Sequence, residues 1–175
     1  MIKKTKSIIG ISLLCAALMS SCDLDRLPLD GPSSETFPAS QKEAEMGLLG
    51  AYKGLTLLDA SSTPIWHVMD NITDIGYARP GNNYTSPITS SITTDNALAT
   101  KPWAAHYKTI GRVHDVLDKL GDIKTSMAEA DYKKIDAELR FIRAYCYSQL
   151  IELYGDVPLL KNALKLGDEL PGRTK

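Results

Sequence analysis

The sequence predicts an all-α protein whose helices pair into hairpins, with a long irregular loop between the first helix and the second. Three stretches repeat apolar residues at steps of three and four, the period of an amphipathic α-helix. Capping residues precede the first and last of these stretches, and a glycine and a proline follow the last. Only residues 121–125 separate the second stretch from the third, and so short a connection indicates an antiparallel hairpin.

The first predicted helix covers residues 41–58. Ser40 and Glu43 have the spacing of a capping box, in which each side chain accepts a hydrogen bond from a backbone N–H at the helix start. The apolar face consists of Ala44, Leu48, Tyr52 and Leu55. Gly50 inside a helix costs about 1 kcal/mol relative to alanine, so we expect a close helix–helix crossing there.

The second predicted helix covers residues 102–120. Pro102 suits the first position of a helix, where its missing N–H would have no partner in any case. The apolar face of this helix consists of Tyr107, Ile110, Val113, Leu117 and Leu120.

The third predicted helix is capped by Ser126 and Glu129, a second capping box, and runs to Tyr154. Gly155 suits a positive φ after the helix, and Pro158 prevents its continuation. One apolar stripe consists of Ile135, Leu139, Ile142, Cys146, Leu150 and Leu153. A second stripe consists of Ala137, Phe141, Ala144 and Ile151. A helix apolar over so wide an arc is expected to pack on two sides.

The polar and reactive side chains of the third helix have structural interpretations. We interpret Arg140 and Arg143, with Asp136 and Glu138 nearby, as ion pairs that tie helices together, because an unpaired buried arginine is costly. A ligand-binding arginine is the alternative. Cys146 lies on the apolar stripe and is expected to behave as a small hydrophobic residue.

Residues 59–101 form the irregular loop, with a short helical turn expected around residues 66–73. The loop places aromatic rings among amides and charges, a composition that suits sugar binding, and loops on a scaffold commonly carry recognition. The candidate ligand-binding residues are Trp66, Asn71, Asp74, Tyr77, Arg79, Asn83 and Tyr84. The alternative is that Trp66 belongs to the core and that the Asn/Gly run only turns the chain.

The N-terminus predicts export and lipid anchoring. Lysines precede a short apolar run, and small residues precede Cys22, which together indicate a lipoprotein signal peptide over residues 1–21. Cys22 is then the lipidated residue, and an ordinary secretory signal is the alternative. Residues 22–39, rich in proline and serine, read as a tether, and residues 40–175 as the helical domain. Several acyl chains give stable membrane anchoring.

Composition and motifs exclude several function classes. The net charge is −1 and no Lys/Arg run follows the signal, which argues against nucleic acid as a partner. No GxSxG, HExxH, P-loop or GxGxxG motif is present, so no catalytic residue and no cofactor is predicted. His67, His106 and His114 complete no metal-ligand set. Asp70 and Asp74 alone would motivate a glycan hydrolase, and solvated surface acids are the better interpretation.

Several strings resemble one known family. A-E-x-R-F-x-R-A-Y-x-Y from residue 137, followed by L-Y-G-D-V-P-L, is similar to a helix of SusD/RagB-type lipoproteins, which are surface nutrient-binding proteins of Bacteroidetes-like bacteria. A-E-M-G-L-L-G-A-Y from residue 44 and W-x-x-x-Y-x-x-I-x-R-V from residue 103 also match. Asp23 and Asp25, just after Cys22, resemble the surface-export signal of such lipoproteins. His114 departs from the family, which commonly has asparagine at that position.

The resemblance implies a tetratricopeptide-like fold, in which helical hairpins stack into an α–α superhelix. It also implies a protein anchored by lipid in the outer membrane and facing the cell exterior. Such a protein binds oligosaccharide or polysaccharide, or less often peptide, and passes it to a SusC-type TonB-dependent transporter. A scaffold lipoprotein without ligand, or a non-functional fragment of a longer SusD-like protein, is the alternative.

The resemblance covers only about the N-terminal third of the family, so we expect an incomplete SusD-like domain. A helix must bury its apolar stripe against another element. With no later helix to cover the third helix, the isolated chain is expected to expose a large apolar patch and to associate or aggregate.

Overall fold

The computed structural model describes residues 33, 36–56, 69–77 and 93–174. Its elements are α2 (Gln41–Leu55), α5 (Ala97–Leu120), the 3₁₀ turn η1 (Lys124–Ser126), α6 (Glu129–Tyr154), and the two-residue strands β1 (Val157–Pro158) and β2 (Arg173–Thr174). The predicted all-α class is confirmed. Within the described residues, no helix is both long and apolar enough to cross a membrane.

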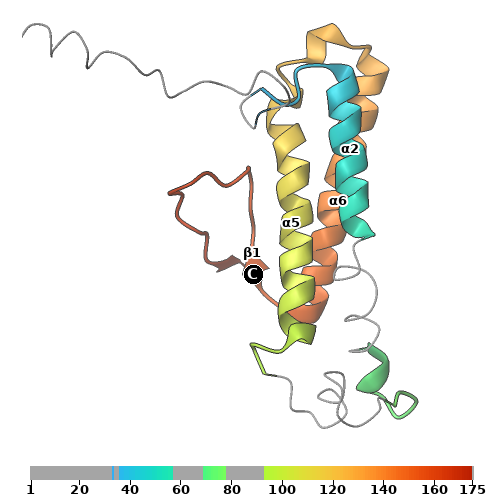
Figure 1. The fold of residues 1–175 in the computed structure, drawn as a ribbon, viewed down its shortest axis with the longest axis vertical. Helices are drawn as coiled ribbons and strands as arrows, with labels where there is room; N and C mark the ends of the chain where they lie inside the picture. Colours follow the sequence, from blue (N-terminus) through green and yellow to red (C-terminus); the bar gives the residue numbers. More distant parts are fainter. Residues whose placement is uncertain (1–32, 34–35, 57–68, 78–92, 175) are drawn as a thin grey trace, which may run out of the picture. The chain divides into compact units, whose positions relative to one another are not determined.

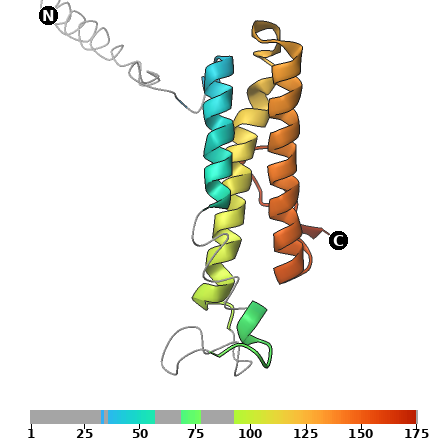
Figure 2. The ribbon, with the colours of Figure 1, turned by 90° about the vertical axis from the view of Figure 1, so that its right-hand side faces the viewer.

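The three long helices of the described residues form one bundle (Figures 1 and 2). The helix α5 packs against both α2 and α6, and it runs antiparallel to each. The core between them is aliphatic and includes Leu48, Ile110, Val113, Leu139 and Ile142, all with exposures of 7% or less. The predicted hairpin of the second and third helices is therefore present.

The start of α2 agrees with the capping prediction. The Ser40 hydroxyl accepts a hydrogen bond from the N–H of Glu43 at 3.3 Å, and the Glu43 carboxylate accepts one from the N–H of Ala39 at 2.8 Å. The carboxylate thus reaches one residue beyond the expected partner, Ser40. The structure ends α2 at Leu55, and residues 57 and 58 of the predicted helix lie outside the described residues.

The prediction of a close crossing at Gly50 was wrong. A Cβ added at Gly50 would meet no atom within 4 Å. The close approaches occur one turn to either side, because a Cβ at Gly47 would overlap Val116 and one at Gly54 would overlap Thr109, both on α5. The face of α2 that carries Gly47 and Gly54 therefore lies against α5.

The start of α5 also differs from the prediction. The helix begins at Ala97, and Pro102 lies buried inside it rather than at its first position. Asn96 caps the helix, since its side-chain oxygen accepts a hydrogen bond from the N–H of Leu98 at 2.8 Å. Leu98 is itself buried, at 4% exposure. The cap and this buried contact compensate for the hydrogen bond that proline cannot make.

The start of α6 also differs from the predicted capping box. Ala128 occupies the cap position, without a side-chain hydrogen bond. Ser126 instead donates its hydroxyl proton to the carbonyl of Ile123 at 2.7 Å and closes the η1 turn. Ile123 is buried at 9% exposure, so this turn is fixed by an apolar anchor and ends before the helix begins. At the other end of α6, Gly155 has the expected positive φ, 69°.

The two apolar stripes of α6 have different environments. The first stripe is buried, except that Leu153 is only partly buried, and Tyr147 is buried as well. The second is exposed: Phe141 is 66% exposed and Ile151 is 57% exposed. The expectation that α6 packs on two sides is therefore wrong for the described residues, whereas the expected exposed apolar patch is present.

The polar contacts of α6 differ from the predicted ion pairs, in which arginines would have joined two helices. The Arg140 guanidinium is 59% exposed and pairs with Asp136 on its own helix at 2.7 Å, so this ion pair joins no helices. Glu138 connects α6 to α2, because its carboxylate accepts a hydrogen bond from the Tyr52 hydroxyl at 2.9 Å. The Cys146 prediction is confirmed: the thiol is fully buried, and burial raises its pKa to about 12.

Candidate functional site

The chain after α6 lies along α5 and is called here the C-terminal strap (residues 157–174). The Tyr107 hydroxyl of α5 donates to the carbonyl of Pro158 at 2.7 Å. The Tyr147 hydroxyl of α6 accepts a hydrogen bond from the N–H of Leu160 at 2.7 Å. Because β1 pairs antiparallel with β2, the far end of the strap returns to its start.

Two more side chains of α5 hold the strap. His114 Nε2 lies 3.2 Å from the carbonyl oxygen of Leu160, and the Asp118 carboxylate accepts a hydrogen bond from the N–H of Ala163 at 2.7 Å. Tyr107, His114 and Asp118 follow each other at helical spacing, so they lie on one face of α5. This face meets the strap backbone at successive points (Figure 1).

A pocket of about 380 Å³ lies between α5 and the strap. Its helical wall carries Trp103, Tyr107, His114 and Asp115, and its strap wall includes Leu160 and Asn162. This volume falls in the usual range for small-molecule sites, roughly 300–1,000 Å³. The lining is mostly apolar, with a carboxylate and an amide at exposed positions.

The aromatic residues of the pocket are fixed by one another. The Trp103 ring centroid lies 4.9 Å from that of Tyr107 and 5.1 Å from that of Tyr154, the latter edge-to-face. The Tyr154 hydroxyl donates to the carbonyl of Ala99 at 2.7 Å. Burial raises the pKa of Tyr107 to about 12, so its hydroxyl keeps its proton at neutral pH and remains a donor to Pro158. The result is a preformed aromatic wall.

The chemistry of this pocket suits a carbohydrate. An apolar ring face of a sugar can stack on an indole, and the sugar hydroxyls can then bond to a carboxylate and an amide. Trp103, Asp115 and Asn162 provide these three kinds of group around one cavity. No group of three histidine, cysteine, aspartate or glutamate side chains positioned to hold a metal ion occurs among the described residues.

Three of the predicted ligand-binding residues lie in the described segment 69–77. Residues 69–71 are helical, in agreement with the expected short turn. Tyr77 is 79% exposed and Asp74 is also exposed, but Asn71 is buried at 5% exposure. The turn is tight, because a Cβ at Gly76 would overlap the backbone of Asp70. Trp66, Arg79, Asn83, Tyr84 and the lipidation residue Cys22 lie outside the described residues.

Two features of the sequence bear on the pocket, although neither predicts it alone. Trp103 and Tyr107 are aromatic residues one turn apart on the second predicted helix. After Gly155, Pro158 prevents continuation of the third helix, so the chain there is extended. A helix face rich in aromatic rings, followed by an extended segment with a fixed start, is the combination that makes this cavity.

Comparison with known proteins agrees with this architecture. Residues 55–166 match the SusD-like family described as starch-binding and associating with the outer membrane. SusD-like protein P25 of Formosa agariphila is 25% identical over 152 residues, which cover 80% of this chain and 28% of that protein. SusD-like protein P2 of the same organism is 22% identical over 171 residues, or 93% of this chain and 32% of that protein.

The chain thus spans about a third or less of the length of these relatives. No solved structure matches the chain. Because the family match extends over well more than half of the sequence, the chain belongs to the SusD-like family, whose description is starch binding and association with the outer membrane.

Proposed function

We propose that this protein is a lipid-anchored surface protein that binds glycan and passes it to a SusC-type TonB-dependent transporter in the outer membrane. The family match over residues 55–166 is the observation that carries the proposal. In this proposal residues 40–175 are the N-terminal helical part of such a protein, and the share of the relatives that the chain covers, 28% and 32%, supports a partial chain. Its action is capture and transfer of a glycan, without catalysis.

Lipidation at Cys22 provides the anchor in this proposal. The signal pattern of residues 1–21 and the tether pattern of residues 22–39 support it. Metabolic labelling with palmitate, followed by protease treatment of intact cells, tests it. Labelled protein that is digested from outside the cell is expected. If Cys22→Ser retains both the label and membrane association, the anchor is elsewhere.

The pocket between α5 and the C-terminal strap is the proposed glycan site. Trp103 supplies the stacking surface, and Asp115 and Asn162 supply hydrogen-bonding groups for hydroxyls. Tyr107 and Tyr147 hold the strap through its backbone, so they position the second wall rather than contact the sugar. Tyr77 and Asp74, which are exposed on the 69–77 segment, are further candidate contacts.

Retention of the unlipidated chain (residues 22–175, Cys22→Ser) in gels containing starch, or other polysaccharides, tests the glycan site. Residues 34–175 form a compact unit of their own, so removing the signal leaves the described bundle intact. Trp103→Leu keeps apolar volume but removes the ring, and it is expected to lose most of the retention. Asn162→Ala, at an exposed position, is expected to weaken it by about tenfold or less.

Phe141→Ala is the matched control, because it removes an exposed aromatic ring that is not part of the pocket. Its retention should equal that of the parent chain. Loss of retention in Tyr77→Ala alone would move the site to the 69–77 segment. A folded chain retained by no glycan would refute the binding proposal and favour a scaffold lipoprotein.

A further inference from the structure

Gly111, in the interior of α5, has no packing reason to be glycine. Glycine is among the least favourable residues for a helix interior. On α2, Gly47 and Gly54 are explained by close packing, because a Cβ at either position would overlap α5. A Cβ at Gly111 would meet no atom of the described residues within 4 Å. The missing side chain at Gly111 therefore leaves space and does not relieve a clash.

That space belongs to the pocket between α5 and the C-terminal strap, because Gly111 is one of the residues that line it. Trp103, Tyr107 and His114 line the same pocket from α5. From Trp103 to His114 these four residues follow each other at steps of four, four and three, so they lie on one face of the helix. Gly111 is thus a gap in a row of large side chains, one turn from Tyr107 and one turn from His114.

The side chains on either side of this gap hold the strap away from the helix backbone. The Tyr107 hydroxyl donates to the carbonyl of Pro158 at 2.7 Å, and His114 Nε2 lies 3.2 Å from the carbonyl oxygen of Leu160. Both contacts reach the strap backbone, so a whole side chain separates α5 from the strap at each point. Between them Gly111 contributes no side chain, and the recess over Gly111 is called here the glycine notch.

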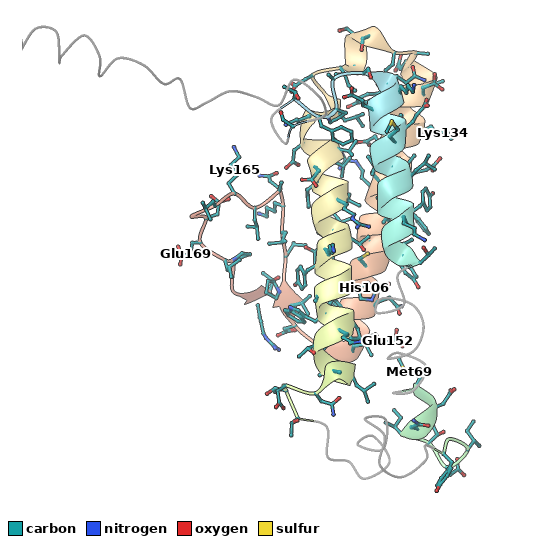
Figure 3. The ribbon with its side chains drawn as sticks, in the orientation of Figure 1. Met69, His106, Lys134, Glu152, Lys165 and Glu169 are labelled. Atoms are coloured by element: carbon teal, nitrogen blue, oxygen red, sulfur yellow. The ribbon has the colours of Figure 1, made fainter. Side chains whose placement is uncertain are left out.

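The glycine notch is bounded by this chain's own residues and does not lie on an open helix face. Its floor is α5, its sides are Tyr107 and His114, and the strap lies opposite. Lys165 and Glu169 of the strap are exposed and point away from α5, so neither fills the notch (Figure 3).

We propose that the glycine notch receives part of a bound oligosaccharide and that Gly111 determines which glycans fit, an inference that rests on the proposed function of the pocket. Trp103 and Gly111 are eight residues apart, or about 12 Å along the helix axis, which is longer than one sugar unit. A glycan that stacks on Trp103 and follows α5 therefore reaches the notch only as an oligosaccharide. A helix carbonyl oxygen has a second lone pair, so it can accept a hydrogen bond from a sugar hydroxyl where no side chain covers it.

Gly111→Ala tests the notch because it has opposite effects on stability and on binding. The added methyl group meets no atom of the described residues, so the helix propensity of alanine should raise Tm by about 2–4 °C. The same methyl group occupies the space of the glycan, and affinity should fall by about tenfold or more. Affinity is measured by calorimetry on the unlipidated chain. The probe is an oligosaccharide cut from the polysaccharide that retains the parent chain, maltoheptaose if that polysaccharide is starch.

Gly50→Ala is the matched control, because it makes the same substitution in open space on α2, outside this pocket. It should raise Tm by a similar amount and leave affinity unchanged. If Gly111→Ala binds the probe as tightly as the parent chain, the notch proposal is overturned while the glycan site stands. Equal losses of affinity in both variants would also overturn it, as would a Gly111→Ala chain less stable than the parent, since other atoms would then fill the notch. A parent chain that binds no glycan would refute the proposed function and this proposal together.

Discussion

The glycines of α2 distinguish close helix packing from open surface, and a pair of alanine substitutions measures the difference. A methyl group at Gly47 would overlap the Cγ2 methyl of Val116 and lie 3.1 Å from Phe37 Cζ. Val116 is fully buried, and a valine in a helix has essentially one side-chain rotamer, so it cannot turn away. At Gly50 the same methyl meets no atom within 4 Å.

The two substitutions share one favourable effect and differ in another. Alanine stabilises a helix interior relative to glycine by about 0.8–1 kcal/mol, so Gly50→Ala should raise the free energy of unfolding by that amount. Gly47→Ala gains the same propensity, but overpacking a filled core costs about 1–3 kcal/mol. Gly50→Ala should therefore be more stable than Gly47→Ala by about 1–3 kcal/mol.

Urea unfolding followed by circular dichroism measures both values in the same unlipidated chain. In thermal unfolding the difference corresponds to about 2–4 °C in Tm for each kcal/mol at this chain length. Equal stability of the two variants would refute the packing of α2 against α5 at Gly47. A destabilised Gly50→Ala would show that the open surface at Gly50 is covered by another element.

Three further outcomes follow from buried polar groups. Among the described residues neither ring nitrogen of His106 has a hydrogen-bond partner, and burial lowers its pKa below the usual 6.5. As the pH falls through 6.5, the unfolded chain therefore gains this proton before the folded chain does. Stability should fall as the pH drops below about 6.5, and less steeply in His106→Leu; identical pH profiles would contradict this. The Cys146 thiol should resist thiol reagents at pH 8 until the chain unfolds, whereas rapid labelling of the native chain would contradict its burial. Tyr147→Phe leaves the Leu160 N–H without its acceptor and should destabilise the chain by about 1 kcal/mol, with faster hydrogen exchange of that amide than in the parent chain.

The parts of the fold that depend on local interactions could be predicted from the sequence. The Ser40 cap is made within four residues, and the first apolar stripe of α6 follows from helical periodicity. The start of α5 could not be predicted in the same way. Asn96 and Pro102 are both signals for a helix start, and the choice between them depends on the burial of Leu98 in the folded bundle.

The candidate pocket was not predicted, for a related reason. The strap is held mainly through its backbone, at Pro158, Leu160 and Ala163, and backbone groups leave no pattern in a sequence. Trp103 and Tyr107 have the same helical spacing whether another helix or an extended segment covers them. The second apolar stripe of α6 (Ala137, Phe141, Ala144 and Ile151) could be predicted from helical periodicity, but periodicity does not specify whether another element covers it.

Calorimetric titration of the unlipidated chain with a starch oligosaccharide tests the claim that the pocket between α5 and the C-terminal strap binds glycan. We predict saturable binding with one site per chain, and loss of most of the heat in Trp103→Leu, while circular dichroism shows an unchanged helical content. The claim is contradicted if the folded parent chain gives no binding heat with starch or any other glycan. It is also contradicted if Trp103→Leu binds as tightly as the parent chain.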